Sequence, residues 1–224
     1  MLVHGAWHGA WCWERVVHRL DAAGIASVTV ENPSVAAAPS DLRADAHNVR
    51  RVLDGIDGDV TLVGHSYGGA VITDAGTHDR VDQLVYLTAF ALDAGESVIA
   101  NELTGGDDMK LGEALCIDGD LVTIEEDRLV EFFFHDCAPD VAAAAVARLR
   151  PQSLPAMAGA VEQVAWRTKP ASYILCTDDR AIPVPLQASN AARVGTTFEL
   201  ATSHSPFLSR PDALAEMLIE INAR

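Results

Sequence analysis

The sequence predicts one α/β domain built on a mainly parallel sheet, and three observations support this prediction. The chain has 224 residues, of which 49% are hydrophobic and 21% are charged, as expected of one globular domain with a buried core. Strand-like and helix-like segments alternate over most of its length, which is typical of parallel strands joined by helical crossovers. A glycine-rich turn at residues 64–69, between a buried strand and a helix, fits the same architecture.

Each element has its own signal in the sequence. Short apolar or β-branched runs predict strands at residues 2–3, 27–31, 60–64, 84–88, 172–176 and 196–200. Amphipathic periodicity and terminal residues predict helices at residues 10–23, 41–53, 66–75, 183–193 and 211–222. Gly24 ends the first helix, Ser40 is expected to cap the second, and Pro183 opens the fourth.

Residues 91–170 interrupt this alternation. Strand signals are few and weak there, and the pattern is mainly helical, with an Ala-rich run at 141–150 that Pro151 stops. We therefore expect residues 1–224 to form a single domain into which residues 91–170 are inserted as a helical cap over one edge of the sheet.

The charge and the ends of the chain narrow the class of protein. A formal charge of −16 argues against nucleic acid and anionic membrane surfaces as partners. We find neither a signal peptide nor an apolar run long enough to span a bilayer, so a cytoplasmic location is expected. The chain begins within its first strand, which indicates a truncated strand or a misassigned start codon. The sequence leaves the oligomeric state open, and a homodimer is one possibility.

The cysteines lack a C-x-x-C spacing and are expected to be free thiols: Cys12, Cys116, Cys137 and Cys176.

Ser66 is the predicted nucleophile. Residues 64–69 read Gly-His-Ser-Tyr-Gly-Gly, which is the pattern G-x-S-x-G between a strand and a helix. Side chains at the glycine positions would clash with the neighbouring strand or helix, and the helix N-terminus favours negative charge that develops beside the serine. A glycine-rich turn with an inert serine is the alternative, and the flanking strand and helix argue against it.

His204 is the predicted base, because a serine hydroxyl needs a group that takes its proton. It follows the last predicted strand, and the ends of parallel strands face one crevice. The order Ser, Asp, His along the chain is that of the α/β hydrolases. The remaining histidines are placed less favourably for this role: His4, His8, His18, His47, His65, His78 and His135.

Three aspartates are candidates for the carboxylate that orients the base. Asp178 and Asp179 both follow the strand at 172–176, and one of them at most can point at His204. Asp93 follows the preceding predicted strand and is the third candidate. Position along the chain leaves this choice open.

Two backbone N–H groups are needed to bind the oxyanion of an acyl-transfer reaction. The amide of Tyr67, directly after the nucleophile, is one donor, and the loop at residues 4–9, His-Gly-Ala-Trp-His-Gly, is placed to supply the other. A simple strand-to-helix turn would explain these glycines, but not their coincidence with the other site residues. His4 and His8 lack a third ligand, so neither a metal nor a cofactor is predicted.

The chain resembles the plant methylesterase and hydroxynitrile lyase family and its bacterial relatives. The likeness covers nearly the whole chain and implies a six-stranded α/β-hydrolase fold that lacks the first two strands of larger hydrolases. It also implies that Asp179 is the acid and that Ala6 and Tyr67 are the oxyanion donors. The segments that carry it are 2–11 (Leu-Val-His-Gly-Ala-Trp-His-Gly-Ala-Trp), 64–69, 176–183 (Cys-Thr-Asp-Asp-Arg-Ala-Ile-Pro), His204, and cap residues 134–137 and 149–151.

Two positions place the chain nearer the esterases than the lyases of this family. The lyases carry a threonine after the first histidine and a lysine after the catalytic histidine, whereas the chain has Gly5 and Ser205 there. Ser205 cannot supply the positive charge that a departing cyanide needs. The resemblance therefore implies a serine carboxylesterase that forms an acyl-enzyme on Ser66.

Aromatic residues favour a small, relatively apolar ester as the substrate. Trp7 in the oxyanion loop and Phe133, Phe134 and Trp166 in the cap are candidates for lining the pocket, and packing inside the cap is the alternative for each. Two other classes stay open. One is a C–C or hydroxynitrile lyase, or a cofactor-free oxygenase, on the same triad. The other is a ligand-binding protein with an inactive site, against which the intact triad argues.

Overall fold

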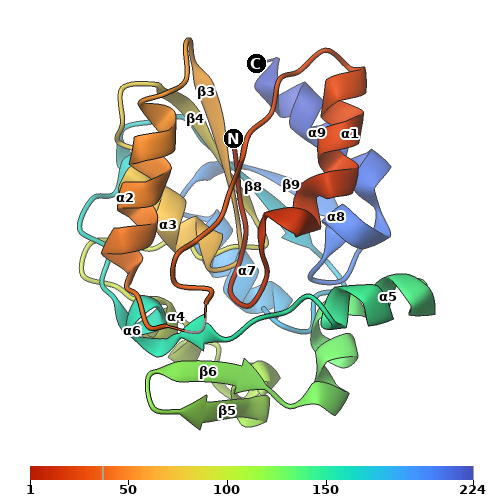
Figure 1. Ribbon diagram of the computed structural model, residues 1–224. Helices are drawn as coiled ribbons and strands as arrows, with labels where there is room; N and C mark the ends of the chain where they lie inside the picture. Colours follow the sequence, from red (N-terminus) through yellow and green to blue (C-terminus); the bar gives the residue numbers. More distant parts are fainter. Residues whose placement is uncertain (37, 224) are drawn as a thin grey trace.

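A computed structural model describes residues 1–36 and 38–223, with a six-stranded parallel sheet at the centre (Figure 1). The order across the sheet is β2-β1-β3-β4-β8-β9, and each neighbouring pair is parallel. The loops that follow the strands therefore meet at one edge. This arrangement confirms the predicted fold class. The strands are β1 (Leu2–Val3), β2 (Thr29–Val30), β3 (Val60–His65), β4 (Val81–Leu87), β8 (Ala171–Cys176) and β9 (Gly195–Leu200).

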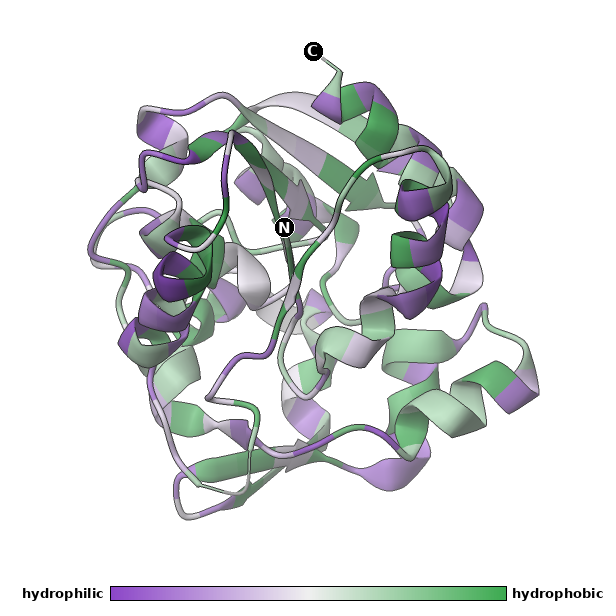
Figure 2. Cartoon of the chain, turned by 45° about the horizontal axis from the view of Figure 1, so that its top comes forward, coloured by the Kyte–Doolittle hydropathy of each residue, from purple (hydrophilic) through white to green (hydrophobic). Residues whose placement is uncertain are grey.

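Helices cover both faces of this sheet. Their bounds, with one short 3-10 turn, are η1 (Ala10–Trp13), α1 (Glu14–Ala22), α2 (Leu42–Leu53), α3 (Gly68–Ala75), α7 (Val184–Ala191), α8 (Pro206–Ser209) and α9 (Pro211–Asn222). α1 packs against α9 on one face, α2 packs against α3 on the other, and α7 contacts β8 and β9 (Figure 1). The strands in the middle carry mostly hydrophobic residues, and the outer sides of the helices carry most of the hydrophilic ones (Figure 2).

α2 shows how the sequence pattern becomes packing. Its buried apolar residues recur at helical spacing and face the core, at Leu42, Ala46, Val49 and Leu53. The expected N-cap at Ser40 is wrong by one residue, since the side chain of Asp41 accepts the hydrogen bond from the Ala44 amide at 2.8 Å. Both residue types favour this position, so the sequence alone could not separate them.

Residues 91–170 lie across the edge of the sheet where its strands end (Figure 1). The segment is not wholly helical as expected, because β5, β6 and β7 form a three-stranded antiparallel sheet. These strands are too short to give a clear alternating pattern in the sequence. The elements are α4 (Val98–Leu103), η2 (Gly106–Asp108), η3 (Lys110–Ala114), β5 (Leu115–Asp118), β6 (Leu121–Ile124), η4 (Glu126–Arg128), η5 (Val130–Phe134), α5 (Pro139–Val146), β7 (Gln152–Ser153), α6 (Leu154–Ala158) and η6 (Ala165–Arg167).

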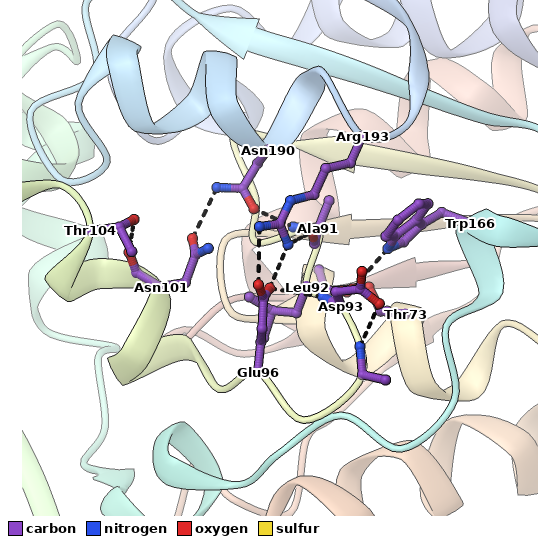
Figure 3. A network of polar contacts seen from close by, with 12 residues as sticks. Thr73, Ala91, Leu92, Asp93, Glu96, Asn101, Thr104, Trp166, Asn190 and Arg193 are labelled. Carbon is purple, nitrogen blue, oxygen red and sulfur yellow. Dashed lines mark hydrogen bonds and ion pairs between the residues drawn. The ribbon is translucent and has the colours of Figure 1, made fainter.

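A polar network ties the start of this segment to α7 (Figure 3). Asn190 accepts a hydrogen bond from the Ala91 amide at 2.9 Å and donates one to the side chain of Asn101 at 3.0 Å. Arg193 forms an ion pair with Glu96 and donates to the Ala91 carbonyl at 3.1 Å. The first turns of the segment are therefore fixed to the body of the domain. Within residues 1–36 and 38–223, no helix is long and apolar enough to cross a membrane.

Candidate active site

Ser66 stands directly after β3, at the turn into α3. Its φ is 52°, in the left-handed region that residues other than glycine rarely adopt. The Ser66 amide donates to the Leu87 carbonyl at 3.2 Å, and the Ser66 carbonyl accepts from the amides of Gly69 at 2.9 Å and Phe90 at 3.2 Å. Such strain persists where the surrounding structure fixes the residue, and here it holds the serine at the edge where the strands end.

Gly64 and Gly68 make this turn possible because they lack side chains. A Cβ atom on Gly64 would lie 2.5 Å from the carbonyl oxygen of Gly68, and one on Gly68 would lie 2.7 Å from the carbonyl oxygen of His4. Both contacts are with backbone, which cannot move aside as a side chain would. The glycine spacing seen in the sequence therefore reflects the close approach of β1, β3 and α3.

His204 and Asp179 form a buried hydrogen-bonded pair. Nδ1 of His204 lies 2.7 Å from Oδ2 of Asp179, and the two side chains are 2% and 0% exposed. Because an ionised carboxylate can only accept, Nδ1 carries the proton and Nε2 is left with the lone pair of a base. The two residues lie in the loops after β9 and β8, which are neighbours in the sheet.

Four donors hold the carboxylate of Asp179. Oδ1 accepts from the amides of Ala181 at 2.7 Å and Ile182 at 3.0 Å. Oδ2 accepts from His204 and also from the hydroxyl of Thr88, at 2.5 Å. Thr88 is not among the site residues predicted from the sequence. The available signal was its place directly after β4, the strand beside the nucleophile strand.

The other two candidate acids lie elsewhere. The side chain of Asp178 is exposed, and its backbone carbonyl accepts a hydrogen bond from Nε2 of His135 at 2.8 Å. Asp93 forms an ion pair with Arg167, with 2.6 Å between the nitrogen and oxygen atoms. In the described part of the chain neither carboxylate contacts His204, so Asp179 is the one of the three candidates that the structure places against His204.

His65, next to the nucleophile, supports the base through its backbone. Nε2 of His65 donates to the carbonyl of His204 at 2.9 Å, and the centroids of the two rings are 4.6 Å apart. Burial, followed by the proximity of His204, holds the pKa of His65 well below its usual range, so its ring is neutral. This contact could not be predicted from the sequence, because it joins residues far apart in the chain.

Ala6 and Tyr67 carry the candidate oxyanion donors. Among the described residues neither amide donates a backbone hydrogen bond, which leaves both able to donate to a bound oxygen atom. The loop of Ala6 touches the nucleophile, since a Cβ on Gly5 would lie 2.8 Å from Cβ of Ser66. Tyr67 is anchored by its side chain, whose hydroxyl donates to Oδ2 of the buried Asp45 at 2.6 Å.

Two aromatic candidates link the cap to the catalytic loops. Phe133, in the π-helical turn η5, has its ring 5.5 Å from the ring of His204, and its carbonyl accepts from the Ser203 hydroxyl at 3.2 Å. Trp7 has a φ of 61° and its ring is 5.8 Å from Phe133. Its indole N–H donates to the carbonyl of Val122 in β6 at 2.9 Å. The loops that contain Trp7 and Ser203 are therefore both tied to residues 91–170.

The other two aromatic candidates, Phe134 and Trp166, lie away from Ser66, Asp179 and His204. Phe134 is fully buried with its ring 5.8 Å from that of His8. Trp166 is half-buried in η6, which packs against α3, and its indole N–H donates to the Leu92 carbonyl at 2.8 Å (Figure 3). Among the described contacts, neither ring reaches Ser66, Asp179 or His204. Over the same residues no three His, Cys, Asp or Glu side chains are grouped to hold a metal ion.

Comparison with known proteins places the chain in a known family. The Alpha/beta hydrolase family matches residues 1–217, so the chain belongs to that family. The chain is 28% identical to the alpha/beta hydrolase nvfD of Aspergillus novofumigatus, over 97% of this chain and 94% of the relative. The carbendazim hydrolyzing esterase of a Nocardioides species is 40% identical over 45% of each chain. The pFDCC methylesterase MES16 of Arabidopsis thaliana is 35% identical over 42% of this chain and 40% of the relative.

A solved structure agrees with these relatives. The pyrethroid hydrolase of Sphingobium faniae JZ-2 has a TM-score of 0.84 and 25% identity, over 98% of this chain and 95% of that one. The predicted resemblance to methylesterases and the predicted enzyme class, a carboxylesterase-like hydrolase, are confirmed.

Proposed function

We propose that the protein is a serine carboxylesterase that cleaves a small, relatively apolar ester through an acyl-enzyme on Ser66. The observation that carries this proposal is the strained turn that brings Ser66 to the same sheet edge as the buried Asp179–His204 pair. The esterase and hydrolase names of the relatives support the reaction class. Residues 91–170 serve as the cap of this single domain.

The reaction follows from the roles of these groups. Nε2 of His204 takes the hydroxyl proton of Ser66 as Oγ attacks the ester carbonyl carbon. Asp179 holds the Nδ1 proton and stabilises the imidazolium. The amides of Ala6 and Tyr67 bind the oxyanion. The carbon–oxygen bond to the alcohol then breaks, and the alcohol leaves with the proton from His204. Water, deprotonated by the same base, releases the acid and restores Ser66.

An ester substrate is better supported than a cyanohydrin. A side chain at position 5 would meet Cβ of Ser66 and Nδ1 of His65 at 2.8 Å, which disfavours a threonine there. Ser205 is fully buried and neutral, so it offers no positive charge to a departing cyanide.

The surroundings of the oxyanion loop support a small, apolar substrate. Ser66 is 7% exposed, which favours substrates slim enough to reach it. A cavity of about 250 Å³ lies against Trp7; its remaining lining is largely apolar, and neither Ser66 nor His204 is part of that lining. Apolar pockets with few polar groups are typical of small-molecule sites. The apolar lining residues are Trp7, Ile124, Leu129, Val146, Ala147, Leu149 and Pro151.

Hydrolysis of p-nitrophenyl acetate and butyrate by the wild type and by Ser66→Ala tests the proposal. We expect wild-type turnover, and a fall in kcat of about 10³-fold or more in the variant. A fluorophosphonate probe should label the wild type at Ser66 and leave the variant unlabelled. Equal activity in both proteins, or a wild type that neither hydrolyses ester nor takes the label, would refute the assignment.

A further inference from the structure

We propose that Thr88 is a positioning residue of the triad, whose hydroxyl holds the carboxylate of Asp179 in the orientation that pairs it with His204. The inference rests on the proposed function and concerns the same site. The Thr88 hydroxyl and Nδ1 of His204 share one acceptor, Oδ2 of Asp179, at 2.5 and 2.7 Å. Thr88 is fully buried, so solvent cannot easily take the place of its hydroxyl.

The backbone of Thr88 is held in a conformation that suits threonine poorly. Its φ is 37°, and positive values are rare for β-branched residues, whereas glycine and asparagine adopt them more readily. Neighbouring groups enforce the conformation. The Thr88 amide donates to the Ile174 carbonyl at 2.8 Å, and the Tyr173 hydroxyl bonds both the amide and the carbonyl of Ala89 at 2.9 Å. A strained residue kept at a strand end beside the triad indicates a role for its side chain.

The hydroxyl completes the support of the carboxylate. Ala181 and Ile182 hold Oδ1 from the loop of Asp179 itself, whereas Thr88 reaches Oδ2 from the end of β4. Without Thr88, the remaining donor to Oδ2 among the described residues is His204, the group that the carboxylate has to orient. Removing the hydroxyl therefore loosens the acid and base together, although the hydroxyl touches neither substrate nor nucleophile. Supporting contacts of this kind affect rate more than substrate binding.

Two substitutions separate the hydroxyl from the shape of the side chain. Thr88→Val keeps the branched shape and removes the donor, and Thr88→Ser keeps the donor and removes the methyl group. We expect Thr88→Val to lower kcat for p-nitrophenyl acetate by about 10- to 100-fold, with KM nearly unchanged, and Thr88→Ser to stay within about 3-fold of the wild type. Thr61→Val is the control, since the Thr61 hydroxyl bonds the Asn222 side chain near the start of β3, at the end of that strand opposite Ser66. Its kcat should be unchanged.

The rate of fluorophosphonate labelling at Ser66 gives a second readout, and should fall in Thr88→Val and recover in Thr88→Ser. If Thr88→Val does not fold by circular dichroism, Thr88→Gly takes its place, because glycine accepts the positive φ and lacks the hydroxyl. A valine or glycine variant with wild-type kcat and labelling rate overturns the proposal, and so does a serine variant as slow as valine. In both cases the proposed function still stands if the wild type turns over ester and Ser66→Ala does not. If the wild type neither hydrolyses the ester nor reacts with the probe, the role of Thr88 and the proposed function are both overturned.

Discussion

The sheet edge and the cap contribute to the site in different ways. At the ends of β3 and β8, backbone geometry places the reacting groups, through the left-handed φ of Ser66 and the two amides that hold Asp179. The cap adds individual side-chain contacts, such as the ring of Phe133 beside His204 and the hydrogen bond from Trp7 to Val122. On the proposed mechanism, the strand ends therefore set the positions of the reacting groups, and residues 91–170 add contacts that hold the neighbouring loops.

The largest effect should come from the sheet edge. Asp179→Asn keeps the size of the side chain but offers His204 no anionic acceptor. The imidazole is then no longer held with its proton on Nδ1, and the imidazolium that forms is not stabilised. We expect kcat for p-nitrophenyl acetate to fall by about 10⁴-fold. Asp178→Asn is the control, because its side chain is exposed beside the same loop, and its kcat should match the wild type. Similar losses in both variants would contradict the choice of acid.

A smaller effect is expected where the cap meets the oxyanion loop. Trp7→Phe keeps an aromatic ring but removes the indole donor to Val122, and one neutral hydrogen bond is worth about 0.5–1.5 kcal/mol. We therefore expect kcat/KM to fall by about 2- to 10-fold and amide hydrogen exchange in β6 to become faster. Trp166→Phe removes an equivalent bond, to the Leu92 carbonyl, at the other end of the cap. Its kcat/KM should not change, and an equal loss in both variants would show that the cap does not act locally on the oxyanion loop.

The same contrast explains what the sequence could predict. The parallel sheet was predicted because its strands are apolar runs between helices of clear periodicity, and β3 is buried over nearly all its length. Ser66 and His204 could be named because each follows a strand, and the ends of parallel strands meet. The G-x-S-x-G spacing also has a local cause, since Gly64 and Gly68 leave no room for side chains.

The remaining features have no local pattern. The strands of the small sheet in the cap are short, so periodicity could not separate them from loops. The bonds from Thr88 to Asp179 and from His65 to the backbone of His204 join residues that the chain separates widely and only the fold brings together. The choice among three aspartates likewise needed either a resemblance to known proteins or the three-dimensional structure, because position after a strand was common to all of them.

Acid titration should separate the two regions through two groups whose burial shifts their pKa in opposite directions. Burial lowers the pKa of His8, in the oxyanion loop, to about 3. Between pH 6.5, where a histidine titrates in the unfolded chain, and pH 3, the unfolded chain binds a proton here that the folded chain does not. The free energy of unfolding therefore falls as the pH falls, by up to about 1.4 kcal/mol per pH unit. Urea unfolding measured at several pH values between 7.5 and 5 should show this slope, and His8→Gln should reduce it.

Glu102, in α4, contributes to the pH dependence of the unfolding free energy with the opposite sign. The residue is half-buried by surface area, and burial of its carboxyl raises the pKa to about 7. Between the ordinary value of 4.5 and about 7 the folded chain holds a proton that the unfolded chain has lost, so this group's contribution to stability is lost as the pH rises. Glu102→Gln should therefore make the wild-type slope between pH 5 and 7 steeper, whereas His8→Gln makes it shallower. If both variants changed the slope of unfolding free energy against pH in the same direction, the opposite pKa shifts assigned to His8 and Glu102 would be contradicted.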